Sequence, residues 1–121
     1  MSNKFYHIDE KNKLVLNNYD NILDCPHISI HIFKQLRNIF GDDFLLLNTQ
    51  QDYVSNYSYM TVINEDAAIG KRSLQSKPKI NIDCYHNIAK ITNREYGYIQ
   101  FIQFSTQEQM ILFKMLNLTN I

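Results

Sequence analysis

The chain has 121 residues, of which 45% are hydrophobic and 20% are charged, and its formal net charge is zero. This length suits one domain, residues 1–121, and the composition excludes global disorder and a membrane span, which needs roughly 18 apolar residues in a row. The N-terminal residues lack the apolar stretch of a secretory signal, so we expect a cytoplasmic protein in which Cys25 and Cys84 are free thiols.

The charge is unevenly distributed along the chain. Residues 1–66 carry a net charge of −4, residues 67–94 carry +5 and residues 95–121 carry −1. The basic middle segment is a candidate surface for a charged partner, through Lys71, Arg72, Lys77, Lys79, Lys90 and Arg94. The alternative is a solvated loop that balances the acidic first half. The 14 Asn and 16 Ile against 3 Gly and 2 Pro favour an AT-rich source, such as a low-GC bacterium or a phage.

The first predicted element is a hairpin over residues 4–18, with a polar turn at residues 9–12 and a loop after it. A helix is predicted next, over residues 26–40. The residues expected to begin and end it are Asp24 as N-cap, Pro26 in the first turn and Gly41 after the last turn. The residues expected on its core face are Ile28, Ile32, Leu36, Ile39 and Phe40.

Strands are predicted in the middle and late parts of the chain. Residues 44–47 and 57–63 read as two strands, and the segment between residues 65 and 77 reads as exposed, with a short helical piece at residues 67–69. Three closely spaced strands are then expected to form an antiparallel meander, with Ile80, Ile82 and Cys84 on one face of the first, residues 88–91 in the second and residues 94–104 in the third.

The chain is expected to close with a helix that begins at a capping box. Ser105 is the predicted N-cap and Glu108 its reciprocal partner. Apolar residues cover more than half of the helix circumference, namely Met110, Ile111, Leu112, Phe113, Met115, Leu116 and Leu118. The helix is therefore either deeply packed, with Phe113 and Leu116 in the core, or packed on one side and used in a protein contact on the other.

Together these elements predict an α+β fold. We expect an antiparallel sheet of about five to six strands, one internal helix and a C-terminal helix packed on the sheet.

The stretch from Arg94 to Phe101 resembles the aromatic-strand signature of RNA-recognition motifs, which has a basic residue, then alternating aromatic residues around a glycine. The resemblance covers eight residues, and it implies that Tyr96 and Tyr98 stack on bases while Arg94 contacts phosphate. Glu95 departs from the signature, which has glycine there. The alternative is a buried central strand, apolar on both faces.

Two Cys-x-His pairs, Cys25 with His27 and Cys84 with His86, contain enough ligands for one zinc ion, but their spacing matches no zinc motif. Buried cysteines acting as small hydrophobes are the favoured interpretation, and we assign no metal and no cofactor. No phosphate-binding glycine loop or nucleophile motif is present, so we assign no catalytic residue.

The function that best fits is a small non-enzymatic binding protein, a stoichiometric inhibitor of a protein partner such as a toxin-immunity protein or a phage-encoded blocker of host defence. The split charge would steer it onto a charged partner. The alternative is an RNA or single-stranded nucleic-acid-binding module that uses the aromatic strand and the basic segment.

Overall fold

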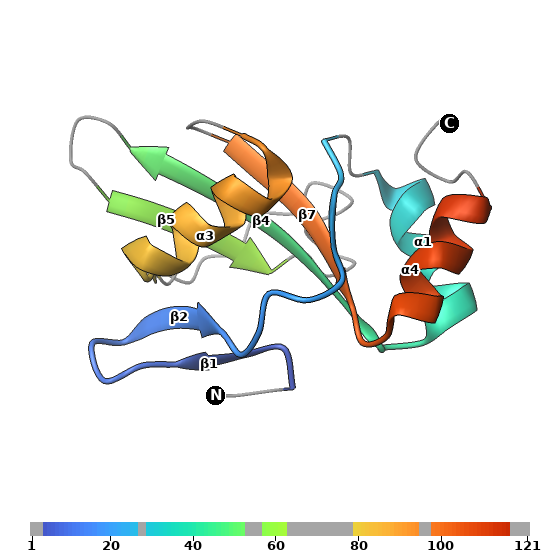
Figure 1. Cartoon of the computed structure of the whole chain (residues 1–121), viewed down its shortest axis with the longest axis horizontal. Helices are drawn as coiled ribbons and strands as arrows, with labels where there is room; N and C mark the ends of the chain where they lie inside the picture. Colours follow the sequence, from blue (N-terminus) through green and yellow to red (C-terminus); the bar gives the residue numbers. More distant parts are fainter. Residues whose placement is uncertain (1–3, 27–28, 53–56, 63–78, 95–97, 117–121) are drawn as a thin grey trace.

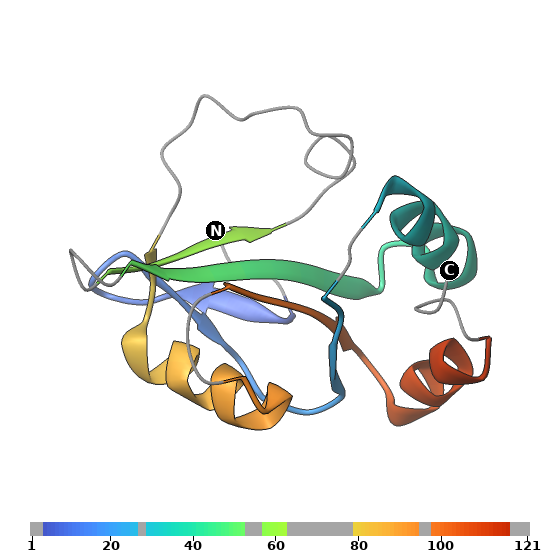
Figure 2. The same ribbon diagram turned by 90° about the horizontal axis from the view of Figure 1, so that it is seen from above.

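The computed structural model describes residues 4–26, 29–52, 57–62, 79–94 and 98–116. In these parts the chain is an α+β protein, in which helices pack against a set of paired strands (Figures 1 and 2). The strands are β1 (Tyr6–Ile8), β2 (Lys13–Leu16), β3 (Ile22–Asp24), β4 (Phe44–Asp52), β5 (Tyr57–Val62), β6 (Lys79–Ile80) and β7 (Tyr98–Phe104). The helices are α1 (Ile30–Phe40), α3 (Ile82–Thr92) and α4 (Gln107–Met115).

The described strands pair in the order β1-β2-β6-β5-β4-β7-β3. All neighbours are antiparallel except β2 and β6, which are parallel. The two-residue strand β6 is the connection between two groups: it pairs with β2 at Lys13 and Leu14 and with β5 at Tyr59. The expected single sheet of five to six strands is therefore not confirmed. The seven described strands form two groups, and these groups are joined only through the two residues of β6.

Two hydrophobic clusters lie on opposite faces of β4 and β7. Because side chains alternate along a strand, Leu45, Leu47, Ile99 and Phe101 point to the face covered by α3, where they pack near Tyr85 and Ile88. Leu46, Ile102 and Phe104 point to the other face and pack against α1 and α4. Figures 1 and 2 show α3 along one face of the sheet and α1 and α4 together at its end. The central strand is thus buried on both faces, as one interpretation of residues 94–104 expected.

Helix α1 begins later than predicted. Its N-cap is Ser29, whose side chain accepts a hydrogen bond from the backbone N–H of Ile32, so Asp24 and Pro26 lie before the helix. Gly41 ends the helix at φ 64°, where glycine has no steric cost, and this part of the prediction is confirmed. Ile32 and Leu36 are buried as expected and Phe40 is half-buried, but Ile39 is exposed and Ile28 lies outside the described residues.

The predicted meander after residue 79 is wrong, because Ile82–Thr92 is the helix α3. The side chain of Asn81 accepts hydrogen bonds from the backbone N–H groups of Asp83 and Cys84, which caps the helix start. Asn93 ends the helix in the left-handed conformation, at φ 57°. The residues buried by the helix are Cys84, Tyr85, Ile88 and Ala89, a helical spacing that places all four on one face.

The short strand β3 was not expected, because no element was predicted between the loop at residues 17–21 and the helix cap expected at Asp24. It pairs with β7, where Ile22 lies opposite Gln103. The Gln103 side chain is buried, and its Nε2 donates to the Asn18 carbonyl, the Asn18 Oδ1 and the Asp20 carbonyl at 3.0–3.2 Å. This amide holds the loop against β7 and so positions β3 at the sheet edge.

The N-terminal hairpin is confirmed as β1 and β2. Strands β4 and β5 are confirmed as well, with β4 longer than the predicted residues 44–47. The short helical piece expected at residues 67–69 lies outside the described residues.

Candidate functional site: the outer face of the closing helix

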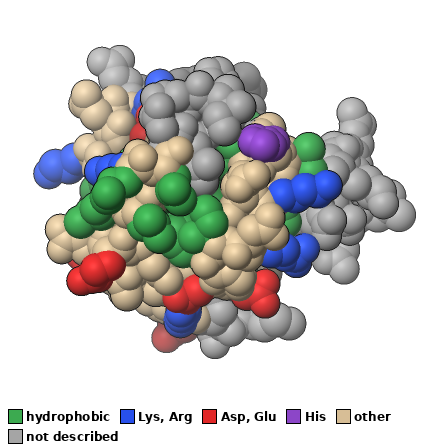
Figure 3. All heavy atoms as spheres, turned by 90° about the vertical axis from the view of Figure 1, so that its right-hand side faces the viewer, with side chains coloured by type: hydrophobic (Ala, Val, Ile, Leu, Met, Phe, Trp, Pro, Cys, Tyr) green, Lys and Arg blue, Asp and Glu red, His purple; other side chains and the backbone are tan. Residues whose placement is uncertain are grey.

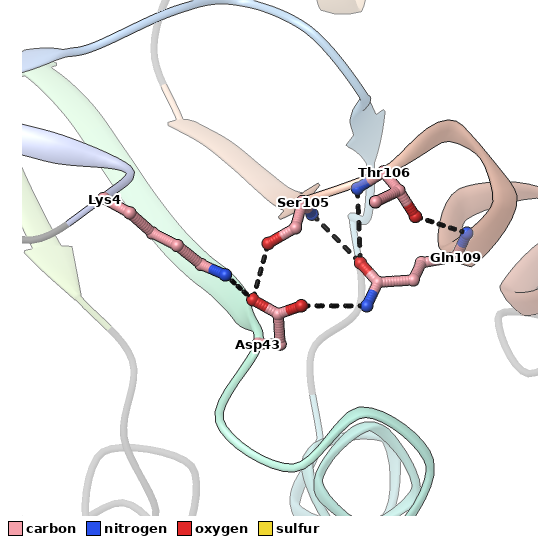
Figure 4. Close-up of polar contacts among 5 residues, drawn as sticks. All are labelled: Lys4, Asp43, Ser105, Thr106 and Gln109. Atoms are coloured by element: carbon pink, nitrogen blue, oxygen red, sulfur yellow. Dashed lines mark hydrogen bonds and ion pairs between the residues drawn. The ribbon is translucent and has the colours of Figure 1, made fainter.

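The closing helix α4 is fixed at its start by a capping box, one residue later than predicted. The Thr106 hydroxyl accepts from the backbone N–H of Gln109 at 3.2 Å, and Gln109 Oε1 accepts in return from the backbone N–H of Thr106 at 3.3 Å (Figure 4). Ser105 is therefore not the N-cap, and Glu108 is not the reciprocal partner. The reason is that the Ser105 hydroxyl instead donates to Asp43 at 2.5 Å.

Asp43, just before β4, joins this cap to the rest of the molecule. Its Oδ1 accepts from Ser105 and from the Lys4 ammonium, and its Oδ2 accepts from Gln109 Nε2 at 2.9 Å (Figure 4). The serine hydroxyl thus donates to a carboxylate that already carries two other hydrogen bonds. The cluster holds the first turn of α4 in place, and its hydrogen bonds are those of a structural cap.

The inner face of α4 packs through Phe113, which is fully buried as predicted. The centroid of its ring lies 5.5 Å from the ring centroid of Phe104, at the end of β7. The ring centroids of Phe104 and Phe40 of α1 are 5.4 Å apart. Met110 is half-buried beside them. These aromatic contacts fix which side of the helix faces the core and therefore which side faces solvent.

The outer face of α4 is apolar and exposed. We call Ile111, Leu112, Met115 and Leu116 the α4 stripe; their spacing of one and four residues places them on one side of the helix. Met115 is 76% exposed, and the other three are 42–46% exposed. The prediction that Leu116 is a core residue is wrong, because it lies at the C-terminal end of the helix, where its side chain is exposed. Leu118 lies outside the described residues.

Figure 3 shows hydrophobic side chains gathered on this end of the molecule. On the neighbouring helix α1, Ile39 is also exposed, at 36%. Exposed apolar residues that stand singly need no explanation, whereas a contiguous group marks an interaction surface. Two charged residues of α4 are exposed as well, Glu108 in its first turn and Lys114 in its last. The outer side of α4 thus combines an exposed apolar stripe with one acidic and one basic side chain.

Three of the six basic residues predicted to bind a partner lie in the described parts of the structure, close to the two ends of α3. Lys79 is half-buried in β6 at the start of α3, whereas Lys90 is exposed near the end of that helix. Arg94 donates to Asp24 at 2.7 Å, and this ion pair raises the pKa of the Arg94 guanidinium. Lys71, Arg72 and Lys77 lie outside the described residues.

Of the two tyrosines predicted to stack on bases, Tyr98 is 55% exposed at the start of β7. Its hydroxyl accepts from Gln100 Nε2 at 2.7 Å. Tyr96 lies outside the described residues. Arg94, expected to contact phosphate, is the arginine paired with Asp24.

The cysteines of the two Cys-x-His pairs lie in different clusters: Cys25 packs with α1, and Cys84 packs under α3. Burial raises the pKa of the Cys84 thiol, which keeps it protonated and unreactive. His86 is exposed, and His27 is not among the described residues. Within the described ranges no three His, Cys, Asp or Glu side chains are grouped as metal ligands would be.

Comparisons of the chain with family models, with curated proteins and with solved structures find no match. None of the helices in the described parts has the length and apolar character needed to cross a membrane.

Sequence reasoning missed Asp43, Thr106 and Gln109, the residues that orient α4. The signal for the cap was present, since Thr106 and Gln109 have the same three-residue spacing as Ser105 and Glu108. Ser105 is not the N-cap because its hydroxyl donates a hydrogen bond to Asp43, which lies 62 residues away along the chain. Local spacing alone carries no information about such a partner.

Proposed function

We propose that this protein is a small non-enzymatic binding protein that forms a stoichiometric complex with another protein through the α4 stripe. The observation that carries the proposal is the two-sided character of α4, in which Phe113 anchors the helix in the core while four other apolar side chains face solvent. Exposing these side chains in water is unfavourable, at about 25 cal/mol per Å² of apolar surface, and a partner that covers them removes this cost.

The rigid placement of α4 supports the same proposal. The capping box, the Asp43 cluster and the aromatic contacts of Phe113 hold the helix at both its start and its middle. A contact surface that is already ordered loses little conformational entropy on binding, which favours affinity. The toxin-immunity or phage anti-defence type remains our interpretation of the protein class, with Lys90 and the rest of the basic segment steering the encounter.

The experiment is a capture with the tagged full-length protein in extracts of its native source, followed by reconstitution with the purified captured protein. Met115→Glu places a charge on the stripe, and we expect it to weaken the reconstituted complex about tenfold or more, since a central contact residue contributes more than 1 kcal/mol. The matched control is His86→Glu, which adds the same charge at an exposed position of α3, away from the stripe.

The melting temperatures of both variants should match that of the wild type, because surface substitutions change stability by only about 0.5 kcal/mol. Equal binding by Met115→Glu and His86→Glu would show that the stripe is not the contact surface. Turnover of a substrate by the purified protein would show that the non-enzymatic class is wrong.

A second candidate function, binding of single-stranded nucleic acid, is favoured by the exposure of Tyr98 on β7. Stacking on an aromatic side chain contributes roughly 1–3 kcal/mol per base, so Tyr98→Ala and Tyr96→Ala should each weaken such binding about tenfold. Fluorescence anisotropy with labelled poly-pyrimidine RNA and DNA at low salt tests this candidate. Micromolar binding that the double variant abolishes, in a folded protein, would favour it over the protein-binding proposal.

A further inference from the structure

We infer that the sheet carries a second binding surface, a row of residues across five strands that binds single-stranded nucleic acid. The inference goes beyond the protein contact proposed for α4, and it rests on the second candidate function, for which it supplies a site. We call these residues the cross-sheet row: Tyr98 of β7, Gln50 of β4, Tyr59 of β5, Lys79 of β6 and Lys13 of β2.

The row follows from the pairing register of the strands. Tyr98 is paired with Gln50, and Gln50 is paired with Tyr59 on the other side of β4. Tyr59 is paired with Lys79, and Lys79 is paired with Lys13. Since neighbouring strands lie about 4.8 Å apart, the four steps span about 19 Å. These residues are far apart in the sequence, so only the fold brings them into one line.

The cross-sheet row is on the face of the sheet away from α3. Side chains alternate along a strand, and Leu14, Ile80 and Ile99, which directly follow residues of the row, are buried in the cluster under α3. The row positions therefore belong to the other face. Figure 2 shows α3 along one face of the sheet and α1 and α4 at its end. Tyr98 is at the start of β7, at the opposite end of this strand from α4.

The two lysines form the basic end of the row. Lys13 and Lys79 are paired on neighbouring strands, and like charges directly opposite one another are unfavourable. An anion held between the two ammonium groups lowers this repulsion. Asp9 follows β1 beside Lys13, but its Oδ1 accepts from the backbone N–H groups of Lys11 and Lys13 at 2.9 Å. No ion pair joins Asp9 to Lys13 in the described ranges. This end of the row therefore suits a phosphate group.

Tyr98 gives the other end of the row an aromatic ring that is 55% exposed. Its hydroxyl accepts from Gln100 Nε2 at 2.7 Å, so the polar tip of the side chain is satisfied and the ring remains for stacking. Aromatic rings that stack on bases, together with basic groups that follow the phosphates, are typical of surfaces that bind single strands without sequence preference. An acidic protein would satisfy the lysines and leave the ring without a matching group.

The test is fluorescence anisotropy of the full chain with labelled poly-pyrimidine RNA and DNA about ten nucleotides long, at several salt concentrations. Lys13→Gln and Lys79→Gln should each weaken binding about fivefold at low salt. Each should also lower the slope of log affinity against log salt by about 0.7, the value for one phosphate contact on a single strand. Tyr98→Ala should weaken binding about tenfold and leave the slope unchanged.

The matched control is Lys34→Gln, which removes the same charge from an exposed position on α1, and it should bind like the wild type. Because Lys79 is half-buried, Lys79→Arg is measured beside Lys79→Gln. It keeps the charge and should bind and melt like the wild type. Circular dichroism melting confirms that each variant is folded.

Absence of binding by the wild type at about 100 μM would overturn both this inference and the second candidate function. The α4 proposal would be unaffected, because capture with Met115→Glu tests it separately. If Tyr98→Ala weakens binding while both lysine variants behave like Lys34→Gln, the row is wrong and the second candidate function stands. If poly-glutamate displaces the oligonucleotide and Tyr98→Ala changes nothing, the lysines bind an acidic protein and the inference is wrong.

Discussion

Gln103 is a buried amide near the end of β7, between two buried apolar residues. Its Nε2 is aimed at three oxygens of the loop before β3, and this arrangement requires a donor at that position. A buried polar group is costly in a core unless it is hydrogen-bonded; here the Nε2 donor is satisfied, whereas the buried Oε1 has no partner among the described residues. The residue therefore acts as the attachment point between the loop and the central strand.

Replacing this donor should be costly. Gln103→Glu places a carboxylate against the same three oxygens, and we expect a loss of roughly 3 kcal/mol or more at pH 7. Burial raises the pKa of the new acid, so its protonated form dominates at lower pH and the loss should shrink towards pH 4. Urea unfolding at both pH values measures this. Gln100→Glu on the opposite, half-exposed face is the control, and an equal loss there would contradict the assigned role of Gln103.

Asp9 organises the turn of the N-terminal hairpin. Its pKa is lowered, chiefly by the backbone N–H of Lys13, with further hydrogen bonds from Asn81 and from the backbone of Lys11. A carboxyl group whose pKa is lower in the folded state stabilises the fold above its unfolded pKa, and this stabilisation is lost as the pH falls through the folded pKa.

We therefore expect Asp9→Asn to be less stable than the wild type at pH 7, and the difference to disappear in acid. Urea unfolding of both proteins at pH 7 and near pH 3 is the measurement. Lys11→Ala, which keeps the carboxylate, is the control. A difference that does not change with pH would show that the charge of Asp9 is not involved.

At the level of elements, the sequence allows two capping boxes at the start of α4, Ser105 with Glu108 and Thr106 with Gln109, and substitutions can distinguish them. Thr106→Ala should cost about 1 kcal/mol in the free energy of unfolding, because it removes the acceptor for the Gln109 N–H. Thr106→Ser keeps the hydroxyl and should be close to the wild type. Glu108→Gln should cost only a few tenths of a kcal/mol, from the lost charge near the helix N-terminus. A larger cost for Glu108→Gln than for Thr106→Ala would favour the cap originally expected from the sequence.

The elements with strong local signals were predictable from the sequence. The N-terminal hairpin, strands β4, β5 and β7 and helix α4 follow from alternation, turn residues and an apolar run after a cap. Helix α3 was not predictable in this way. The spacing of Ile80, Ile82 and Cys84 fits the two-residue period of a strand as well as the spacing of Cys84 and Ile88 fits a helix. The caps at Asn81 and Asn93 decide for the helix, and asparagine is as common in turns as in caps.

The candidate site was predictable only in part. The apolar excess of the closing helix indicated either burial or a protein contact, and the sequence offered no way to choose. The choice depends on Phe104, since its ring orients Phe113 inward and leaves Met115 outside. The basic segment was predicted from the number of charges along the chain alone. In the fold, Lys79 lies before α3 and Lys90 lies near its end, so the length of the helix separates them. Charge in sequence becomes a surface only where the fold places it on one face.

At the scale of the whole molecule, β4 and β7 form a partition between two cores that share one sheet. Cys25 lies in the core under α1, and Cys84 lies in the core under α3. Because successive residues of β4 alternate between the two cores, loss of one core should disrupt the other. We expect both cores to unfold in a single cooperative transition.

The two thiols report on this directly. In the variants Cys25→Ser and Cys84→Ser the remaining thiol should be protected in the native protein and should react with a thiol reagent at the same urea concentration, near the global midpoint. Burial raises the pKa of Cys84, which slows its reaction further. Global unfolding followed by circular dichroism is the reference. Reaction of one thiol well below the midpoint would show that its core opens independently.

The position of β7 has a consequence for synthesis of the chain. It is the last strand in sequence among those described, yet it lies between β4 and β3, and Gln103 pairs with Ile22 near the other end of the chain. A ribosome that adds about 5–20 residues per second needs about 4–16 s to make the chain between these two partners. Throughout that interval β3 lacks its neighbour, and the edge of β4 lacks it from the time that β4 has been made. Unpaired edges promote aggregation. We therefore expect the yield of folded protein to depend on translation speed and on early binding by chaperones. The stability of the finished fold should have a smaller effect on this yield.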